Sequence, residues 1–209
     1  MVRTFDIEAK FIVSLIPDGG GNGAWVGTED HGVYHYDGNA EADKQWKQYK
    51  NEPGDPNGYA LALDKQGRLW VGTLNHGVSV FNGETWKTYD VIDGPLGERI
   101  FDIQVCSVDG DVWIASSGGI TRYRTKTDSW KHYTRACGLP EDQASSLAFL
   151  RNGDLIIGTQ CHGLVLMGRS AQGEYTIASY IGGLMRPTLS LLIQVPSLQD
   201  AINLYEKYY

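Results

Sequence analysis

Short runs of apolar residues, separated by glycine-containing turns, recur along most of this chain. In LALDKQGRLWVGT, an apolar run ends at Gln66-Gly67 and is followed by a second run rich in bulky side chains. Two later segments repeat the pattern with Asp109-Gly110 and Asn152-Gly153 at the turn. Such turns between apolar runs favour tight hairpins, because glycine and asparagine adopt positive φ at little cost. The pattern therefore predicts pairs of antiparallel β-strands.

Two further strands are expected after each hairpin. The third reads GVYHYDG, GVSVFNG, GITRYRT and GLVLMGR in successive units, and the fourth reads QWKQYK, TWKTYD, SWKHYT and a weaker EYTIAS. No ten-residue helical periodicity occurs before residue 197. Four short antiparallel strands in each repeat indicate the blade of a β-propeller.

The repeats are evenly spaced. The phrases AWVGT, LWVGT, VWIAS and LIIGT follow one another at intervals of 45, 43 and 43 residues, which is the period expected of propeller blades. We therefore predict an all-β propeller of four-stranded antiparallel blades. Four blades are expected around residues 10–50, 57–90, 99–134 and 142–180.

The two ends of the chain suggest a fifth blade. Val2–Asp6 resembles the fourth strand Trp86–Asp90, and GLMRPTLSLLIQ resembles a first strand. We expect residues 1–6 and 184–209 to form an irregular, composite last blade, which closes residues 1–209 into one domain and removes exposed sheet edges. Because PSLQDAINLYEKYY contains no hairpin phrase, the alternative is a homo-oligomer that assembles through the incomplete blade.

Composition limits the partners. A net charge of -7 and a pI near 5.2 argue against a broad nucleic-acid surface, and no run reaches the roughly 18 apolar residues of a membrane span. We expect no nucleic acid and no membrane insertion. The N-terminus lacks the apolar run of a signal peptide, so the chain is either cytoplasmic or a domain cut from an exported protein. Cys137 and Cys161 form either a disulfide or a pair of free thiols.

Repeated aromatic and acidic residues have structural interpretations. Tryptophans at equivalent places in the second and fourth strands are expected to pack between blades, namely Trp25, Trp70, Trp113, Trp46, Trp86 and Trp130. Asp18, Asp64 and Asp109 lie beside the hairpin turns, where a carboxylate can accept hydrogen bonds from the turn backbone. We predict that these aspartates stabilise turns and do not bind calcium, which needs several carboxylates converging in one loop.

Two segments carry a family resemblance. LDKQGRLWVGTLNHGVSVFNGETWKTY (Leu63 to Tyr89) and HYTRACGLPEDQASSLAFLRNGDLIIGT (His132 to Thr159) resemble the two-component regulator propeller repeat, over about residues 10 to 195. The resemblance implies an extracytoplasmic ligand-sensing domain of a bacterial sensor protein, often for carbohydrates. The streptogramin lyases are a more distant resemblance and imply an enzymatic alternative.

Three histidines form the candidate site. WVGTEDHG, WVGTLNHG and IIGTQCHG place His31, His76 and His162 before a glycine, in turns that share one mouth of the propeller channel, whereas the third blade has SSGGI there. Imidazole can contact ligands and act as a base, although a polar residue before glycine is also ordinary turn usage. Asn57, Arg99 and Asp142, in the links that precede first strands, are expected to complete the site.

We therefore predict a non-catalytic recognition propeller that binds a small polar molecule, such as a saccharide, or a protein segment at the channel mouth. No metal site and no cofactor are expected, because equivalent positions of neighbouring blades lie too far apart for bonds of roughly 2 Å to one ion. One alternative is a lyase-like enzyme in which a histidine acts as general base beside Glu29 or Asp142. The other is a scaffold that assembles with itself.

Overall fold

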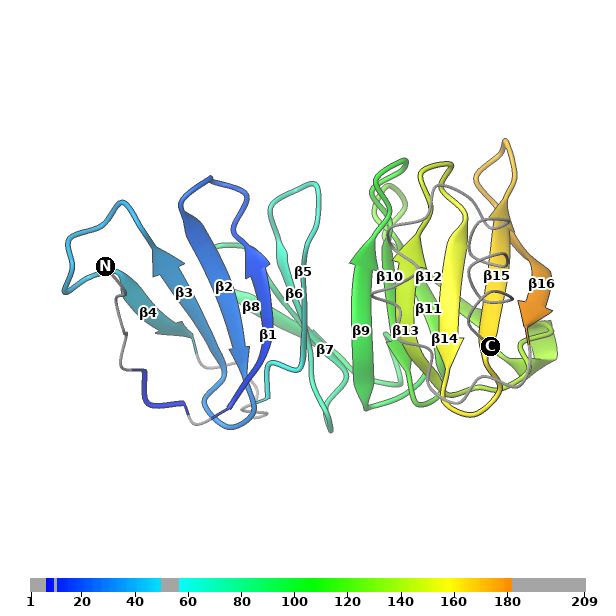
Figure 1. Cartoon of the computed structure of the whole chain (residues 1–209), viewed down its shortest axis with the longest axis horizontal. Coiled ribbons are helices and arrows are strands. Elements are labelled where there is room, and N and C mark those ends of the chain that lie inside the picture. The colour runs from blue at the N-terminus through cyan, green and yellow to red at the C-terminus, as the bar shows by residue number, and fades with distance from the viewer. Residues whose placement is uncertain (1–6, 10, 50–56, 182–209) are drawn as a thin grey trace, which may run out of the picture.

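The computed structural model describes residues 7–9, 11–49 and 57–181, and within them the chain forms four antiparallel sheets of four strands each (Figure 1). Each sheet has its strands in chain order, with every strand paired to its neighbour in sequence. This arrangement confirms the predicted all-β propeller blades. The predicted fifth blade falls on residues 1–6 and 184–209, which lie outside the described residues.

The four sheets are called blades 1 to 4, and their bounds follow the repeats. Blade 1 contains β1 (Ile12–Pro17), β2 (Gly23–Thr28), β3 (Val33–Asp37) and β4 (Trp46–Tyr49). Blade 2 contains β5 (Ala60–Leu63), β6 (Leu69–Gly72), β7 (Val78–Phe81) and β8 (Trp86–Tyr89). Blade 3 contains β9 (Ile100–Val105), β10 (Val112–Ser116), β11 (Gly119–Arg124) and β12 (Ser129–Tyr133). Blade 4 contains β13 (Ala144–Phe149), β14 (Leu155–Thr159), β15 (Leu164–Arg169) and β16 (Tyr175–Ile181).

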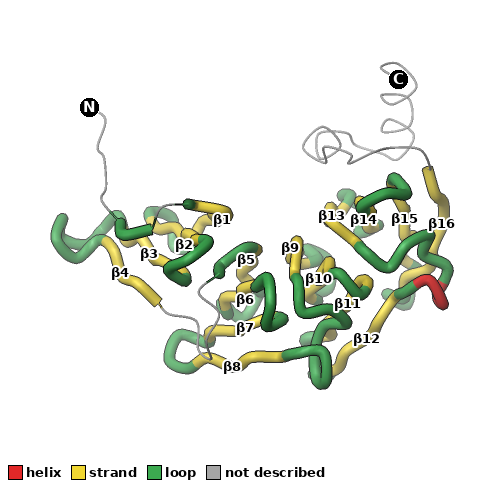
Figure 2. The backbone as a smooth tube through the Cα atoms, turned by 90° about the horizontal axis from the view of Figure 1, so that it is seen from below, coloured by secondary structure: helices red, strands yellow, loops and turns green. Residues whose placement is uncertain are grey.

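The blades stand side by side along an arc, as Figure 2 shows in end view. The first strands β1, β5, β9 and β13 line the inner side of the arc, and the fourth strands lie on its outer side. Contacts between neighbouring first strands hold the inner wall together. A short 3-10 helix, Arg135–Cys137, lies in the link from blade 3 to blade 4. This helix is too short to cross a membrane, and no other helix occurs in the described residues.

Alternation along the second strand places apolar side chains on both faces of each blade. In β6, Leu69 and Val71 pack against blade 1, whereas Trp70 between them packs against blade 3. All three are at most 1% exposed. Successive side chains of a strand point to opposite faces, so a strand buried on both sides needs apolar residues at every position. Each such side chain contributes about 1.5–3 kcal/mol when fully buried.

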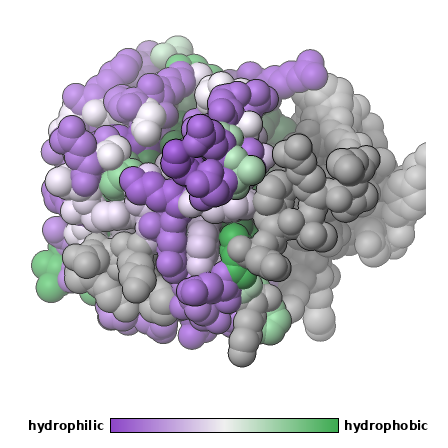
Figure 3. Space-filling model, turned by 90° about the vertical axis from the view of Figure 1, so that its left-hand side faces the viewer, coloured by the Kyte–Doolittle hydropathy of each residue, from purple (hydrophilic) through white to green (hydrophobic). Residues whose placement is uncertain are grey.

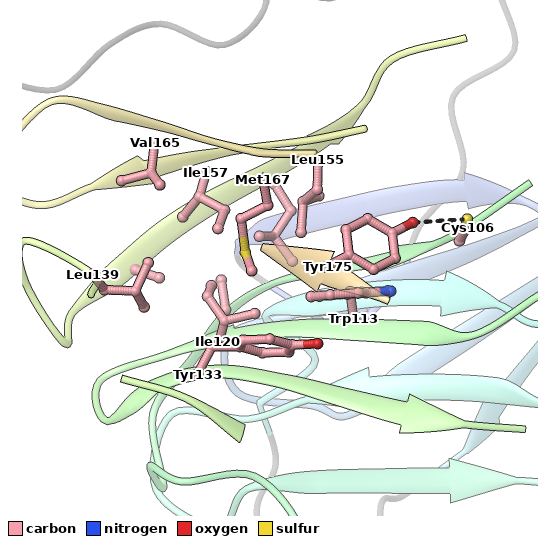
Figure 4. Close-up of a cluster of buried hydrophobic side chains, with 13 residues drawn as sticks. Cys106, Trp113, Ile120, Tyr133, Leu139, Leu155, Ile157, Val165, Met167 and Tyr175 are labelled. Atoms are coloured by element: carbon pink, nitrogen blue, oxygen red, sulfur yellow. Dashed lines mark hydrogen bonds between the residues drawn. The ribbon is translucent and has the colours of Figure 1, made fainter. Parts of the chain in front are cut away.

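The second-strand tryptophans are the largest side chains between the blades, as predicted. Trp25 contacts Phe81 of the next blade, and Trp70 contacts Tyr123 of the next, with ring centroids 6.3 and 4.9 Å apart. Trp113 stacks on Tyr133 of its own blade and meets Tyr175 of blade 4 at 4.6 Å (Figure 4). In blades 1 to 3, one tryptophan side chain therefore packs against the apolar face of the blade that follows.

The aspartates at the hairpin turns accept backbone hydrogen bonds, which confirms their predicted role. Asp18 accepts a bond from the N–H of Gly20, and Asp109 accepts one from the N–H of Asp111. Asp64 accepts bonds from the N–H groups of Gln66 and Arg68 and, in addition, from the indole N–H of Trp70. The same carboxylate thus holds the turn and orients the interblade tryptophan.

A buried ionic cluster, which the sequence did not predict, joins blades 3 and 4. The guanidinium of Arg122 (4% exposed) donates to Asp111 at 2.8 Å and to the carbonyl oxygen of Gly173 in blade 4 at 2.8 Å. It lies over the rings of Trp113 and Tyr175, 5.4 and 5.1 Å from their centroids. The cluster therefore carries charge, hydrogen bonds and cation–π contacts across one interface.

Asp109 belongs to the same cluster. Its carboxylate lies 3.3 Å from Arg122 and 3.3 Å from Arg169 of blade 4. Burial acts to raise the pKa of Asp109, but the backbone hydrogen bond from Asp111 and the two guanidinium groups outweigh it, so that the pKa lies below its ordinary value of 3.8. The folded state therefore favours the ionised carboxylate.

Arg122→Met should destabilise the protein strongly. The substitution keeps an apolar stem but leaves Asp111 without its buried guanidinium partner, and breaking a buried pair in this way costs about 3–5 kcal/mol. The free energy of unfolding, measured in urea at pH 7, should fall by that amount. Arg124→Met is the matched control: Arg124 pairs with Glu174 at side-chain exposures of 31% and 47%, so screening limits its loss to about 1 kcal/mol.

Acid should weaken the same interface. Because the folded-state pKa of Asp109 is lowered, its contribution is present above the unfolded pKa of 3.8 and is lost as pH falls through the lowered value. The wild-type unfolding free energy should therefore decrease below about pH 4. This decrease should be smaller in Arg122→Met, and equal pH dependence in the two proteins would contradict the assignment.

Candidate functional site

The histidine-bearing loops lie at one edge of the propeller, together with the links between blades. We call this the histidine edge: the turns at residues 28–32, 73–77, 116–119 and 159–163 and the links at residues 57–59, 90–99 and 134–143. It is the lower edge in Figure 1 and faces the viewer in Figure 2. Main-chain bonds join turns to links, from Gly58 N–H to Thr28 O, from Gly77 N–H to Glu98 O and from Gln160 N–H to Gln143 O.

A buried threonine hydroxyl closes each histidine turn. In blade 4, Thr159 Oγ1 donates to the carbonyl oxygen of Gly163 at 3.0 Å and accepts from the N–H of His162 at 3.1 Å. The hydroxyls of Thr28 and Thr73 make the same two bonds at 2.8 to 3.0 Å. The histidine thus takes part in the turn through its main-chain N–H, which any residue except proline supplies.

Glycine is required after the histidine. Gly77 adopts a φ of +69°, and a Cβ placed there would lie 2.4 Å from the carbonyl oxygen of Tyr89 in the fourth strand. The left-handed conformation and the close backbone approach both exclude a side chain. Blade 3 builds the same turn without histidine, because Ser116 Oγ donates to Gly119 O and accepts from the N–H of Gly118.

The fold therefore explains the threonine and the glycine of the repeated phrase but does not explain the imidazole. His76 and His162 are exposed, and His31 is half-buried. Their rings extend from turns that the threonine hydroxyls already hold. A side chain that the turn does not require, placed on a rigid loop, can serve a role beyond the turn.

Two of the imidazoles contact carboxylates. His31 Nδ1 lies 2.8 Å from Asp30 Oδ1, and His162 Nδ1 lies 3.3 Å from Glu141 Oε2. When the Nδ1–H is donated to a carboxylate, Nε2 is left as a hydrogen-bond acceptor. The ring of His162 can thus present an oriented acceptor nitrogen to a ligand, whereas Nδ1 of His31 is close to Asp30 but makes no hydrogen bond with it. The carboxylates are Asp30 and Glu141, and not the expected Glu29 and Asp142.

Glu141 is a candidate residue that sequence reasoning missed. Its carboxylate also accepts the N–H of Cys161 at 2.9 Å, and its side chain is only 17% exposed, against 52% for His162. It therefore connects the link before blade 4 to the histidine turn of the same blade. The available signal was the acidic pair Glu141-Asp142 in the GLPEDQ segment, but spacing alone did not say which of the two faces the imidazole.

The remaining predicted residues also lie on the histidine edge, with different roles. Asp142 accepts the N–H of Arg135 at the start of the 3-10 helix, at 2.6 Å, so its carboxylate serves the link. The carbonyl oxygen of Arg99 accepts the N–H of Ser117, while its side chain is exposed. Asn57 is half-buried beside Gly58. The structure thus brings all six predicted residues to one edge, with His31 and His162 beside carboxylates.

Thiols and carboxylates complete the chemistry of this edge. Cys137 and Cys161 are exposed and both are free thiols, which answers the alternative left open by the sequence. Within residues 7–9, 11–49 and 57–181, no group of three or more histidine, cysteine, aspartate or glutamate side chains is placed to hold a metal ion. The arrangement offers hydrogen-bond acceptors and two carboxylate–imidazole pairs.

Comparison with known proteins agrees with the repeat. Residues 53–75 match the family model described as two component regulator propeller. No curated protein matches the chain. The match covers a single hairpin and its flanks, and these residues contain the LWVGT phrase.

Solved structures share the fold. The extracellular domain of the "putative hybrid two component system BT3049" from B. thetaiotaomicron superimposes with a TM-score of 0.65 at 18% identity, over 86% of this chain and 23% of that one. An auxiliary nutrient binding protein from Bacteroides ovatus superimposes with a TM-score of 0.56 at 12% identity, over 80% of this chain and 42% of that one. A protein titled "putative gluconolactonase" superimposes with a TM-score of 0.57 at 15% identity, over 83% of this chain and 64% of that one.

These likenesses establish the propeller fold and nothing finer. The three proteins bear names of a sensor, a binding protein and an enzyme, so the shared architecture does not select among functions. The chain spans about a quarter of the length of the sensor domain and less than two thirds of the other two.

Thr159→Val should destabilise the protein more than His162→Ala does. Removing the buried hydroxyl leaves His162 N–H without its acceptor, while Gly163 O keeps only the main-chain bond from the N–H of residue 159, and the unsatisfied donor costs about 1–3 kcal/mol. Loss of the half-exposed imidazole removes only a screened contact with Glu141, worth about 1 kcal/mol or less. Urea unfolding at pH 7 measures both. Thr176→Val, at an exposed position of β16, is the matched control and should change stability by less than about 0.5 kcal/mol.

Proposed function

We propose that this propeller is a non-catalytic recognition module that binds a small polar ligand, a saccharide in the first instance, at the histidine edge. The proposal rests on one observation. Threonine and glycine close these turns without help from an imidazole, yet histidine recurs at three of them. Rigid loops around one opening of a propeller are a common place for ligand sites.

The ligand class follows from the chemistry of the edge. The Nε2 acceptor of His162, whose ring is held by Glu141, suits a ligand rich in hydroxyl groups, as do the amide of Asn57 and the guanidinium of Arg99 in the links of the same edge. Acidic side chains outnumber Lys and Arg along the histidine edge, where Glu29, Asp90, Asp93 and Glu98 are also exposed. A neutral polyol therefore fits better than an anionic ligand, which these carboxylates would repel.

Among the similar propellers, the extracellular domain of a two component system and the nutrient binding protein are precedents for a recognition role, and the gluconolactonase is one for an enzymatic role. In the proposed role, binding at the histidine edge would report the presence of an extracellular carbohydrate to a partner of the propeller. An extracytoplasmic location is part of this proposal, because the sensor domain with the similar fold is extracellular.

A specific observation also favours a second function. Glu141 and His162 form a carboxylate–imidazole pair of the kind that positions a general base, with Nε2 directed away from the carboxylate. On this alternative, the propeller is a lyase-like enzyme in which His162 abstracts a proton from a bound substrate. The two functions differ in one result, because only the enzyme consumes its ligand.

Neutral oligosaccharides should stabilise the protein against heat. A ligand at about 100 times its dissociation constant adds about 2.7 kcal/mol to the unfolding free energy. A thermal-shift panel of neutral, uronic and sulfated oligosaccharides, followed by calorimetric titration of any that bind, measures the effect. We expect a neutral member to bind, and His162→Ala and Glu141→Gln to weaken it about tenfold, or about 1.4 kcal/mol each.

Lys126→Ala is the matched control, because Lys126 is exposed in the turn between β11 and β12, at the opposite edge. It should bind with wild-type affinity. Equal affinity in His162→Ala would contradict the proposed site, and a preference for sulfated members would contradict the ligand class. Conversion of the bound saccharide to product by the wild type, abolished in His162→Ala, would establish the enzymatic alternative.

A further inference from the structure

The links of the histidine edge repeat one main-chain hydrogen bond. In three blades, a carbonyl oxygen at the end of the link accepts the N–H of the residue that opens the turn of the same blade, and we call the accepting residue the rim residue. These bonds run from Glu29 to Phe11, from Ser117 to Arg99 and from Gln160 to Gln143, at 3.0 to 3.1 Å. A phenyl ring, a guanidinium and an amide thus occupy one structural position. The fold uses the main chain there and leaves the side chain to differ.

The rim residue also lies beside the preceding blade. In blade 3, the N–H that follows Arg99 donates to the carbonyl oxygen of Thr73, at 2.8 Å. The N–H that follows Asn57 makes the same bond with Thr28, at 2.7 Å, which identifies Asn57 as the rim residue of blade 2. Both acceptors are threonines that close a histidine turn. A rim residue is therefore fixed by its main chain between two turns of the histidine edge.

In blade 4, this series selects Gln143 and not its neighbour Asp142. The carboxylate of Asp142 accepts the N–H of Arg135 at the 3-10 helix, so it serves the link. Gln143 is the residue whose carbonyl oxygen binds the turn. Its side chain is half-buried, and its amide makes no side-chain hydrogen bond in the part of the chain that the structure describes. The amide is thus not required by the link or by the turn.

Gln143 belongs to the same small area as the carboxylate–imidazole pair of blade 4. The carboxylate of Glu141 accepts the N–H of Cys161 at 2.9 Å and lies 3.3 Å from Nδ1 of His162. Two residues further along the link, the carbonyl oxygen of Gln143 binds the same turn. The link and the turn therefore run beside each other here, and they bring an imidazole and an amide together.

The imidazole and the amide offer complementary hydrogen bonds. When Nδ1–H is donated to Glu141, Nε2 of His162 can only accept, whereas the amide of Gln143 can both donate and accept. Two adjacent hydroxyl groups of a sugar match this pair, because one can donate to Nε2 while its neighbour bonds to the amide. The described surface at the blade 1 end of the molecule is also mostly hydrophilic, with apolar atoms in small groups (Figure 3).

We propose that Gln143 is a ligand-contacting residue of the histidine edge, and that its amide binds the hydroxyl group next to the one that donates to His162. The inference rests on the proposed recognition of a neutral saccharide. It narrows that ligand to a sugar that presents two adjacent hydroxyl groups to blade 4. Gln143 serves the fold through its main chain and specificity through its side chain.

The test combines a change in the protein with a change in the probe. The probes are the methyl glycosides of glucose, galactose, mannose and xylose, titrated into the isotope-labelled full chain, with the amide signals of residues 159–163 followed by NMR. Monodeoxy derivatives of the glycoside that binds most tightly then remove one hydroxyl group at a time. Gln143→Leu removes the amide and keeps the main chain.

Gln143→Leu should bind that glycoside about tenfold more weakly than the wild type does. For one deoxy derivative the two proteins should bind equally, because the missing hydroxyl is the partner of the amide and the two losses do not add. The melting temperature of Gln143→Leu should equal that of the wild type. Gln66→Leu, the same exchange at an exposed position of the hairpin edge, is the matched control. This control and Asp142→Asn should bind as the wild type does.

A loss of equal size for the glycoside and for every deoxy derivative would overturn the contact, because the effect of Gln143 would then be indirect. Wild-type affinity in Gln143→Leu, with weaker binding in His162→Ala, would overturn this inference and leave the proposed function standing. Equal losses in Asp142→Asn and Gln143→Leu would contradict the choice between the two neighbours. If no glycoside and no member of the oligosaccharide panel binds, the proposed function fails and this inference fails with it.

Discussion

The packing of each blade's second strand between two neighbouring sheets is the constraint on which the rest of this structure depends. A strand such as β6 has apolar side chains at every position because both of its faces are covered. A single blade cannot bury these residues, because both faces of an isolated sheet would be exposed to water. The stack along the arc therefore supplies the core that each repeat lacks, and the tryptophan knob sets how one blade meets the next.

The polar ends of the blades depend on the same stack in different ways. At the hairpin edge, Asp64 and Asp109 serve their turns and also contact groups between blades, Trp70 in one interface and Arg122 in the other. At the histidine edge, threonine hydroxyls close the turns without help from imidazole. The hairpin edge thus contributes contacts between blades. At the histidine edge, the imidazoles are not required to close the turns from which they extend.

Recognition of a polar ligand rests on the loops and links at the histidine edge, above all on Glu141 and His162. This proposal follows from comparison among equivalent positions of the repeat, which shows what the fold alone requires.

The sequence by itself determined the repeat, the strand order and the hairpin turns, because these depend on local features: alternation of apolar residues, glycine at positive φ and a constant period. It also placed all six candidate residues on one edge, since topology fixes which loops share an edge. Spacing did not identify Glu141 as the partner of His162, nor Arg122 as the centre of an ionic cluster reaching Gly173 and Asp109. Those contacts join segments that are distant in the sequence and meet only in the folded protein. Which way a carboxylate points depends on the local backbone conformation, which spacing does not give. The tertiary structure therefore decided which polar side chains meet.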